Sequence, residues 1–99
     1  MSKITEAARG MPCLINLPIC NWNPETTVAA HYRDTALGAG MGIKPPDILS
    51  AHACSACHDV IDGRRHIDGW THEQIRAAHA LGVLKTIYKL QKLGKVKIQ

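Results

Sequence analysis

The sequence predicts a small α+β domain that a bound metal ion holds together. Three observations carry this prediction: four cysteines form two pairs, a short β-branched segment lies between the pairs, and a long helical pattern follows them. The chain has 99 residues and no Phe, so its core lacks large apolar side chains. Since a domain of this size buries a small share of its surface, a metal or a cross-link would supply the missing stability. We therefore expect residues 1–99 to form one domain.

The two pairs of cysteines have the arrangement of one tetrahedral zinc site. They are Cys13 and Cys20, then Cys54 and Cys57. Each pair can hold the ion from a tight turn while the intervening chain folds back across it. The Cys54/Cys57 spacing is typical of zinc ligands, whereas the gap between Cys13 and Cys20 is wider than usual. Four thiolates would close the coordination shell, so we expect this zinc to be structural.

Two other uses of the cysteines are open from the residues alone. Disulfides would need an oxidising compartment. The segment CSACH at residues 54–58 is also the attachment pattern of c-type haem, but haem would leave Cys13 and Cys20 without a role. The N-terminal residues lack the layout of a signal peptide, and no apolar run approaches the roughly 20 residues of a membrane span. We therefore expect a cytoplasmic protein with reduced thiols and no membrane contact.

The first half of the chain predicts little regular structure. Residues 1–10 indicate a loosely held lead-in, and residues 12–20 indicate a small knuckle that carries two thiolates. Residues 26–33 begin with β-branched side chains and lie between turn signals, which predicts a strand. The glycine-rich residues 36–46 favour a flexible connector over a nucleotide-binding loop. Asp47 is then expected to cap a short turn.

Two helices are predicted in the second half of the chain. Residues 55–62 form a short helix that ends at the glycine following it. The longest element covers residues 71–94, where Thr71 and Gln74 match a capping box and apolar residues recur at helical spacing. Residues 95–98 alternate in polarity and are expected to be a short strand or a frayed tail.

The positive charge of the protein lies mainly in the C-terminal segment. The whole chain has a formal net charge of +4, yet the residues from Thr71 onwards contain six basic side chains against Glu73 alone. Lys85, Lys89 and Lys92 are spaced four and three apart, so they share one stripe of the helix. Such a basic stretch favours a polyanion partner, nucleic acid first, although a solvated helix face would have the same composition.

Two of the six histidines lie where the predicted zinc site would bring them together. His31 is near the end of the predicted strand, and His58 follows the second cysteine pair on the short helix. If one ion binds all four cysteines, the strand and the helix become neighbours across a small cleft. One histidine could then act as a general base, while the other helps to hold a divalent cation. Asp62 lies four residues after His58 and shares its helix face.

The succession of these features resembles the ββα-metal nucleases of the HNH class. A thiolate pair is followed by a strand ending in His31, a glycine-containing loop and a Cys-x-x-Cys-His segment that opens a helix. More narrowly, the chain is similar to the YbcO-type family of small prophage-encoded nucleases over most of its length. The segments that carry this similarity are ARGMPCLINLPICNWNPETTVAAHYR, GMGIKPPD and ACSACHDVIDGR.

The resemblance implies a small zinc-stabilised HNH-like domain with a longer C-terminal helix. It also implies a metal-dependent endonuclease that hydrolyses DNA phosphodiester bonds. His31 matches the general base that deprotonates the attacking water. His58 matches a ligand of the catalytic cation, magnesium or manganese, and Asp62 is a plausible second ligand.

The chain departs from the pattern of the HNH class at two positions. Many members have Asp or His immediately before the base, where this chain has Ala30. The middle Asn of the class name has no clear counterpart, and Asp47 is the nearest polar candidate. We assign Asp47 to the cation site together with His58 and Asp62. Either it replaces the missing Asn, or a backbone carbonyl orients the base.

Several basic side chains are candidate contacts to the DNA backbone. Arg33 lies two residues after His31 and would point to the same side of a strand. The full set is Arg33, Arg64, Arg65, Lys85, Lys89 and Lys92. The alternative to an enzyme is a non-catalytic zinc-containing module that binds nucleic acid or assists recombination. The sequence leaves open the oligomeric state and any protein partner that supplies specificity.

Overall fold

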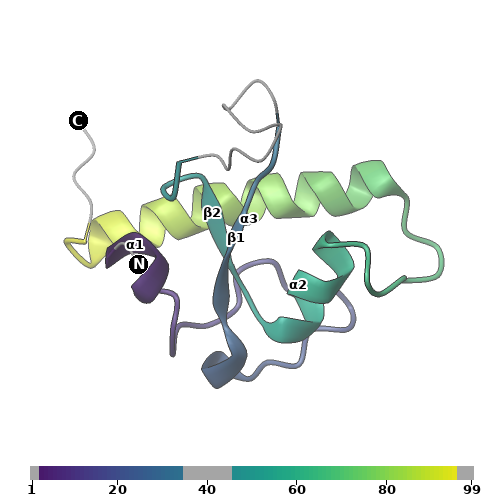
Figure 1. The fold of residues 1–99 in the computed structure, drawn as a ribbon, viewed down its shortest axis with the longest axis horizontal. Coiled ribbons are helices and arrows are strands. Elements are labelled where there is room, and N and C mark those ends of the chain that lie inside the picture. Colours follow the sequence, from purple (N-terminus) through teal and green to yellow (C-terminus); the bar gives the residue numbers. More distant parts are fainter. Residues whose placement is uncertain (1–2, 35–45, 96–99) are drawn as a thin grey trace.

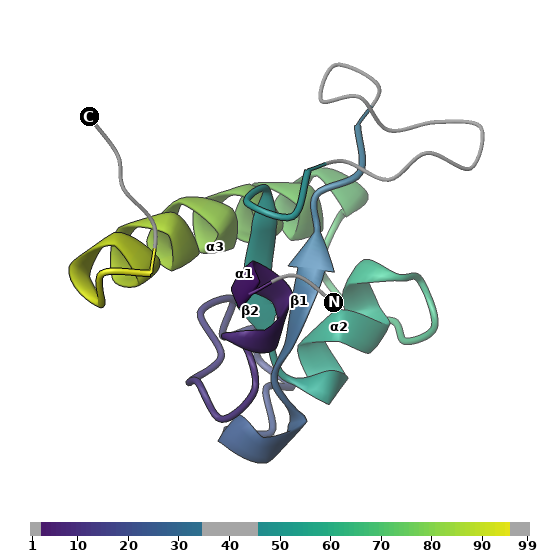
Figure 2. The same ribbon diagram turned by 60° about the vertical axis from the view of Figure 1, so that its left-hand side comes forward.

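The computed structural model describes residues 3–34 and 46–95, and the α+β class is confirmed. In Figure 1 the long helix α3 lies along one side of a two-stranded sheet, and the short helix α2 lies beside strand β1. Figure 2 shows the same arrangement after a turn of 60°. The elements in chain order are α1 (Lys3–Glu6), η1 (Pro24–Thr26), β1 (Val28–His31), β2 (Ser50–Ala53), α2 (Ser55–Ile61) and α3 (His72–Lys92).

The two strands pair antiparallel, with Val28 opposite Ala53 and His31 opposite Ser50. Strand β1 is shorter than the strand predicted over residues 26–33, because residues 24–26 form the 3-10 turn η1. The sequence analysis did not predict β2, whose residues Ser-Ala-His-Ala include no β-branched side chain. All four are buried, so packing on both faces decides this strand rather than intrinsic propensity.

The outer edge of β2 is covered by the knuckle and by α3. The carbonyl of His52 accepts the N–H of Leu14 at 2.8 Å, and the N–H of His52 donates to Thr86 Oγ1 at 2.9 Å. Between Cys13 and Cys20, the side chains of Ile15 and Leu17 are buried in the core. The wide gap between these two cysteines therefore supplies core residues as well as a turn.

Both predicted helices are confirmed. The Sγ atom of Cys54 accepts the N–H of Cys57 and caps α2, which Gly63 follows with φ +79°. The capping box of α3 is present: Thr71 Oγ1 accepts the N–H of Gln74 at 3.1 Å, and Gln74 Oε1 accepts the N–H of Thr71 at 2.8 Å.

Helix α3 has apolar side chains on both of its faces. The face toward β2 buries His79, Val83, Thr86 and Leu90, of which Leu90 is 1 % exposed. The opposite face leaves large apolar residues in solvent, namely Leu81, Leu84 and Tyr88. The core of the domain thus accounts for only part of the helical pattern seen in the sequence.

The predictions for the two termini and for the glycine-rich connector have different outcomes. Residues 1–10 were expected to be a loosely held lead-in, but within them α1 forms one turn and Ala8 is fully buried. The predicted glycine-rich connector lies outside the described residues except for Pro46, and the predicted tail lies outside them except for Lys95. Within residues 3–34 and 46–95, no helix has the length and apolar character needed to cross a membrane.

Helix α3 passes close to β2 at Gly82. A Cβ atom at this position would lie 2.8 Å from Ile15 Cγ1 and 3.2 Å from Ala51 Cβ. Replacing Gly by Ala favours a helix by about 1 kcal/mol, but overpacking a core commonly costs about 1–3 kcal/mol. We therefore expect Gly82→Ala to lower the free energy of unfolding by about 1 kcal/mol, as measured by urea denaturation.

The control for this prediction is Lys85→Ala at an exposed position of the same helix. We expect it to change the free energy of unfolding by less than about 0.5 kcal/mol. If Gly82→Ala were more stable than the wild type, the close packing of α3 on Ile15 and Ala51 would be wrong.

Candidate functional site

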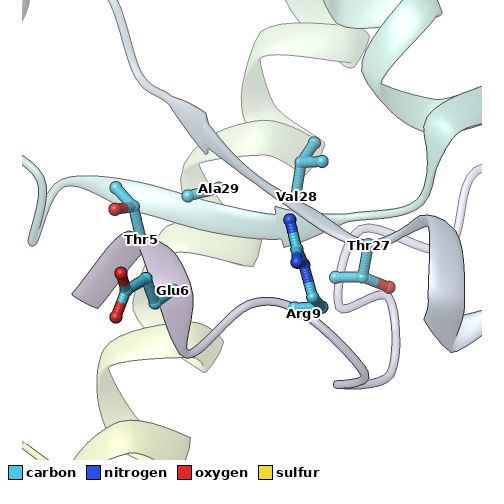
Figure 3. A pocket seen from close by; sticks show the side chains of 6 residues that line it. All are labelled: Thr5, Glu6, Arg9, Thr27, Val28 and Ala29. Carbon is cyan, nitrogen blue, oxygen red and sulfur yellow. The ribbon is translucent and has the colours of Figure 1, made fainter. Parts of the chain in front are cut away.

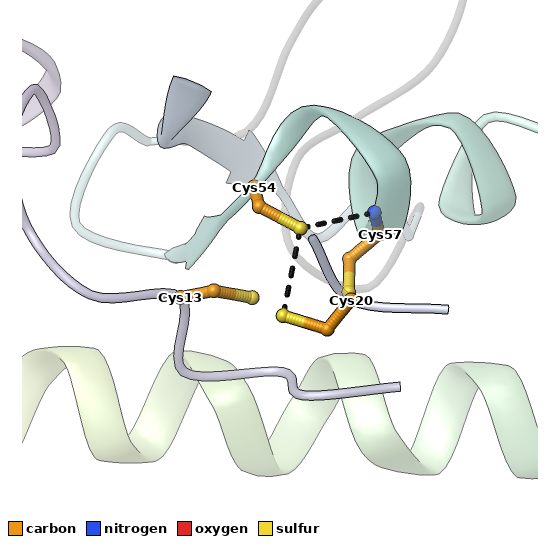
Figure 4. Close-up of side chains that lie close together, drawn as sticks. All are labelled: Cys13, Cys20, Cys54 and Cys57. Atoms are coloured by element: carbon orange, nitrogen blue, oxygen red, sulfur yellow. Dashed lines mark hydrogen bonds between the residues drawn. The ribbon is translucent and has the colours of Figure 1, made fainter. Parts of the chain in front are cut away.

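The four cysteines meet in one buried cluster. Their Sγ atoms all lie within 4.8 Å of one another (Figure 4). Cys13 and Cys20 come from the N-terminal knuckle, whereas Cys54 and Cys57 come from the start of α2. In a tetrahedral zinc site with Zn–S bonds of about 2.3 Å, sulfur atoms lie about 3.8 Å apart. The Sγ atoms of Cys20 and Cys54 are 3.7 Å apart, so the cluster has the dimensions of such a site.

The pKa values of three cysteines in the cluster are shifted by their surroundings, and not all in the same direction. A hydrogen bond from the Cys57 thiol lowers the pKa of Cys13 to about 4, and the same bond raises the pKa of Cys57. Burial raises the pKa of Cys20 to about 11. Four buried thiolates would repel one another without a positive charge between them. A divalent cation supplies that charge, which is why the donor set suits a metal such as zinc.

The structure decides between the uses of the cysteines that the sequence left open. All four are free thiols, so they form no disulfide. Cys54 and Cys57 are fully buried and close to the other two cysteines, which suits one ion shared by all four. In the part of the chain that the structure describes, this cluster is the one group of three or more potential ligands that is close enough to hold a metal ion.

The side chains of His31 and Asp47 lie within hydrogen-bonding distance of each other. The Nε2 atom of His31 lies 2.8 Å from Asp47 Oδ1, and the two side chains are 12 % and 25 % exposed. When the neutral imidazole donates from Nε2 to this carboxylate, its other ring nitrogen, Nδ1, keeps a lone pair. Asp47 was assigned to the cation site in the sequence analysis. That assignment stays a prediction, and Asp47 Oδ1 also lies close enough to His31 Nε2 to orient the imidazole, as a substitute for the missing Asn would.

His58 and Asp62 share one face of α2, as predicted. His58 Nε2 lies 3.4 Å from Asp62 Oδ2, and both side chains are about one third exposed. A guanidinium nitrogen of Arg64 also contacts Asp62 Oδ2, at 2.6 Å. This pair offers one imidazole nitrogen and one carboxylate to a cation, with Arg64 as a competing positive charge.

The remaining candidate residues fall into two places. Arg33, Arg64 and Arg65 are exposed on the segments that follow β1 and α2. Lys85, Lys89 and Lys92 are exposed on α3, where the buried face is turned to β2 and the lysine side is turned to solvent. The arginines therefore lie close in sequence to the two histidine pairs, whereas the lysines lie on a different side of the molecule.

A surface hollow of about 450 Å³ lies between α1 and β1 (Figure 3). It contains none of the residues that the sequence analysis selected. Its lining consists of Thr5, Glu6, Arg9, Thr27, Val28 and Ala29. The two histidine pairs thus lie outside this hollow.

Comparison with known proteins places the chain in a family. The model of the family described as "Putative nuclease YbcO" matches residues 2–95. The chain belongs to the YbcO family. The protein of that name from Escherichia coli strain K12 is 54% identical over 67 residues, which cover 67% of this chain and 69% of the relative. The same values hold for the protein of that name from Enterobacteria phage 82.

A solved structure of similar fold supports the same assignment. It is described as the structure of "a putative bacteriophage protein" from Escherichia coli strain K-12 MG1655. The TM-score is 0.74 at 37% sequence identity, with 91% of this chain and 98% of the other covered. The similarity in fold to this solved structure therefore extends over nearly the whole chain.

Sequence reasoning missed two residues of α3 that hold the end of β1 in this YbcO protein. His79 is 3 % exposed, and its Nε2 atom donates to the carbonyl oxygen of Ala30 at 2.8 Å. Arg76 lies over the ring of Tyr32 at 4.4 Å and donates to Asp34 Oδ2 at 3.2 Å. These contacts lie on both sides of His31 in sequence. The apolar neighbours of His79 on the helix gave no signal that a polar partner was required there.

The pH dependence of stability tests the burial of His79. Burial lowers its pKa, and the nearby charges of Arg76 and His58 lower it further. The unfolded chain therefore binds more protons at this residue, and the contribution of His79 is fully present above about pH 6.5 and lost as pH falls below it. We expect the unfolding free energy of His79→Gln to fall less steeply than that of the wild type between about pH 7.5 and about pH 5.5. The free energy is measured by urea denaturation at each pH.

Both proteins carry the same cysteine cluster, so acid-induced loss of metal affects them equally and cancels in the comparison of slopes. The amide of Gln keeps a donor for the Ala30 carbonyl, which limits the change to the titrating group. Equal slopes for the two proteins would show that His79 does not titrate between the folded and unfolded states.

Proposed function

We propose that this YbcO protein is a metal-dependent endonuclease of the HNH type that hydrolyses DNA phosphodiester bonds in the cytoplasm. His31 is the proposed general base, and His58 with Asp62 is the proposed site of a divalent cation such as magnesium or manganese. Zinc on the four cysteines is the proposed structural ion. The name of the family and of its relatives supports a nuclease. The free thiols support a reducing compartment.

The order of the elements supports the HNH type. An antiparallel hairpin, β1 and β2, leads directly into α2, and the second cysteine pair stands at that junction. His31 is the last residue of β1, and His58 lies in the first half of α2 immediately after Cys57. His79 on α3 donates to the carbonyl oxygen of Ala30, the residue before His31, and α2, which carries His58 and Asp62, contacts both β1 and α3.

The observation that carries the proposal is the pairing of His31 with Asp47 at 2.8 Å. A general base needs an unprotonated nitrogen, a fixed orientation and a counter-charge for the proton that it accepts. Asp47 provides the fixed orientation and the counter-charge by accepting a hydrogen bond from the Nε2–H group. The Nδ1 lone pair of His31 is then available to take a proton from a water molecule that attacks the phosphorus atom. Asp47 stabilises the imidazolium that results.

His58 and Asp62 are proposed to hold the catalytic cation, with water and phosphate oxygens in the other coordination positions. A divalent cation there would stabilise the negative charge that develops on the phosphate and on the leaving 3′ oxygen. Arg64 contacts Asp62 at 2.6 Å, and we propose that its guanidinium binds a neighbouring phosphate when Asp62 turns to the cation.

The proposed contacts to DNA close to this site are Arg33, Arg64 and Arg65. They are exposed and follow the elements that carry the two histidine pairs. Lys85, Lys89 and Lys92 face solvent from another side, so a duplex at the histidines would reach them only by bending around the domain. Contacts to the phosphate backbone give affinity that falls steeply with salt and little preference for base sequence.

The experiment that tests the proposal is plasmid nicking by the zinc-loaded full chain. Supercoiled DNA is incubated with the protein in Mg²⁺, in Mn²⁺ and with no added cation, and gel shifts are run in parallel across a salt series. We expect relaxed circles only when a divalent cation is added. Gel shifts that weaken with salt, without nicking in either metal, would overturn the enzyme and leave the non-catalytic nucleic-acid-binding module.

A further inference from the structure

The exposed face of α3 carries an apolar stripe that neither the core nor the proposed active site uses. Leu81, Leu84 and Tyr88 are 52 %, 64 % and 59 % exposed. Ala77 precedes them and is also exposed. These positions are separated by four, three and four residues, which is the spacing of the a and d positions of a coiled coil. The stripe extends in the same spacing to Gln74 and Gln91, both exposed. We name residues 74, 77, 81, 84, 88 and 91 the outer stripe.

The outer stripe matches itself when a second α3 is laid against it in the opposite direction. In the register that places Leu81 beside Leu84 of a second copy, Ala77 meets Tyr88 and Gln74 meets Gln91. The largest side chain of the stripe is thereby placed against the smallest, and the two leucines form the centre. A parallel arrangement would set Tyr88 against Tyr88 and Ala77 against Ala77, which leaves one layer crowded and another with a gap.

Charge favours the same antiparallel arrangement. The acidic residue Glu73 lies in the first turn of α3, whereas Lys89 and Lys92 lie in its last turn. In the antiparallel register the lysine-rich last turn of each helix lies level with the first turn of the other, which carries Glu73, although Glu73 and Lys92 stand on opposite sides of the seam. The dipoles of the two helices also oppose each other, which is favourable. In a parallel pair the two lysine-rich last turns would instead lie at the same end.

We propose that two copies of this chain associate through the outer stripe as an antiparallel, two-fold symmetric pair of α3 helices. Such an interface is isologous, because each contact occurs twice. The histidine pairs lie on the other side of each domain, where His79 on the buried face of α3 binds the carbonyl of Ala30. Both candidate sites therefore stay open in the dimer. The proposal does not depend on the nuclease activity.

The first test measures the mass of the zinc-loaded full chain in solution. The chain has a mass of 10.8 kDa, and sedimentation velocity over a range of protein concentrations should show a species of twice that mass. Leu84→Lys places a charge at the centre of the seam and should give a monomer throughout the range. Leu93→Lys is the matched control: Leu93 is 48 % exposed at the end of the same helix but lies outside the outer stripe, so this variant should still dimerise.

Circular dichroism and zinc content establish that each variant is folded, which is expected because both substituted side chains are exposed. A wild type that is monomeric at all concentrations, or a Leu84→Lys variant that dimerises as well as the wild type, would overturn the proposal. Loss of the dimer in Leu93→Lys as well would place the interface outside the outer stripe.

The second test determines the direction of the two helices. A spin label is attached at Lys92→Cys while zinc protects the four native cysteines. In the antiparallel register the labelled positions are 19 residues apart along the helix axis, or about 28 Å at 1.5 Å per residue. In a parallel pair they would be separated by about the interhelical distance of 10 Å. A measured distance near the shorter value would overturn the antiparallel arrangement.

Discussion

Cys54→Ser is expected to abolish zinc binding and the cooperative unfolding transition. Cys54 is fully buried, links β2 to α2 and caps α2 through its sulfur atom. A serine hydroxyl is a poor ligand for zinc beside three thiolates. The binding free energy of a structural zinc is commonly on the order of 10 kcal/mol, and in small domains it is folding free energy. That figure is comparable with the whole unfolding free energy of a domain, which is about 5–15 kcal/mol.

The measurements are zinc stoichiometry by elemental analysis and thermal unfolding by circular dichroism. Wild type should hold one zinc per chain and unfold in one transition. Ser55→Ala is the control at the next residue, since Ser55 is exposed and loses only a hydrogen bond from Asn21. A Cys54→Ser variant that keeps one zinc and the wild-type transition would show that the cluster does not hold the domain together.

His31→Ala is expected to reduce the rate of DNA nicking by about 10²- to 10⁴-fold, the usual contribution of a general base. The fold and the zinc content should be retained, because His31 is not part of the cysteine cluster or of the buried core. Asp47→Asn should lower the rate by a smaller factor, because the amide keeps a hydrogen bond to His31 but no longer supplies a negative charge.

The rate is measured as the initial conversion of supercoiled plasmid at a fixed concentration of Mg²⁺ or Mn²⁺. His66→Ala provides the matched control, since His66 belongs to neither histidine pair: its side chain is 81 % exposed and lies next to Asp68. It should nick at the wild-type rate. Wild-type activity in His31→Ala would remove His31 from the mechanism even if the protein proved to be a nuclease.

Features that depend on neighbouring residues were predictable from the sequence. The short helix after Cys54 and the capping box at Thr71 and Gln74 are local arrangements, and the structure has both within about a residue of the expected bounds. The grouping of the four cysteines was predictable for a different reason. Two close pairs of cysteines in a chain of this size are typical of one metal site. The contact between the two pairs could therefore be inferred before the fold was known.

Features that depend on contacts between distant residues were not predictable. Strand β2 has no strand-forming residues, and its position follows from Leu14 on one side and Thr86 on the other. His79 and Arg76 contact β1 and the residues after it from more than 40 positions away in sequence. No local pattern marks such residues, because a histidine on an apolar helix face looks the same with or without a partner.

Asp47 illustrates the boundary between the two kinds of prediction. Its chemistry as a carboxylate near the base was recognised, and its assignment to the cation site stays a prediction. The contact between Asp47 and His31 joins residues 16 positions apart, and no local pattern in the sequence predicted it.

The sequence by itself determined which chemical groups this protein has and which elements form locally, because ligand spacing, helix caps and turn residues act over a few positions of the chain. Only the tertiary structure decided which groups meet: Asp47 with His31, Arg64 with Asp62, and His79 with the backbone before the proposed base. The physical reason is that burial and hydrogen bonding between distant segments select one partner among several of equal chemistry.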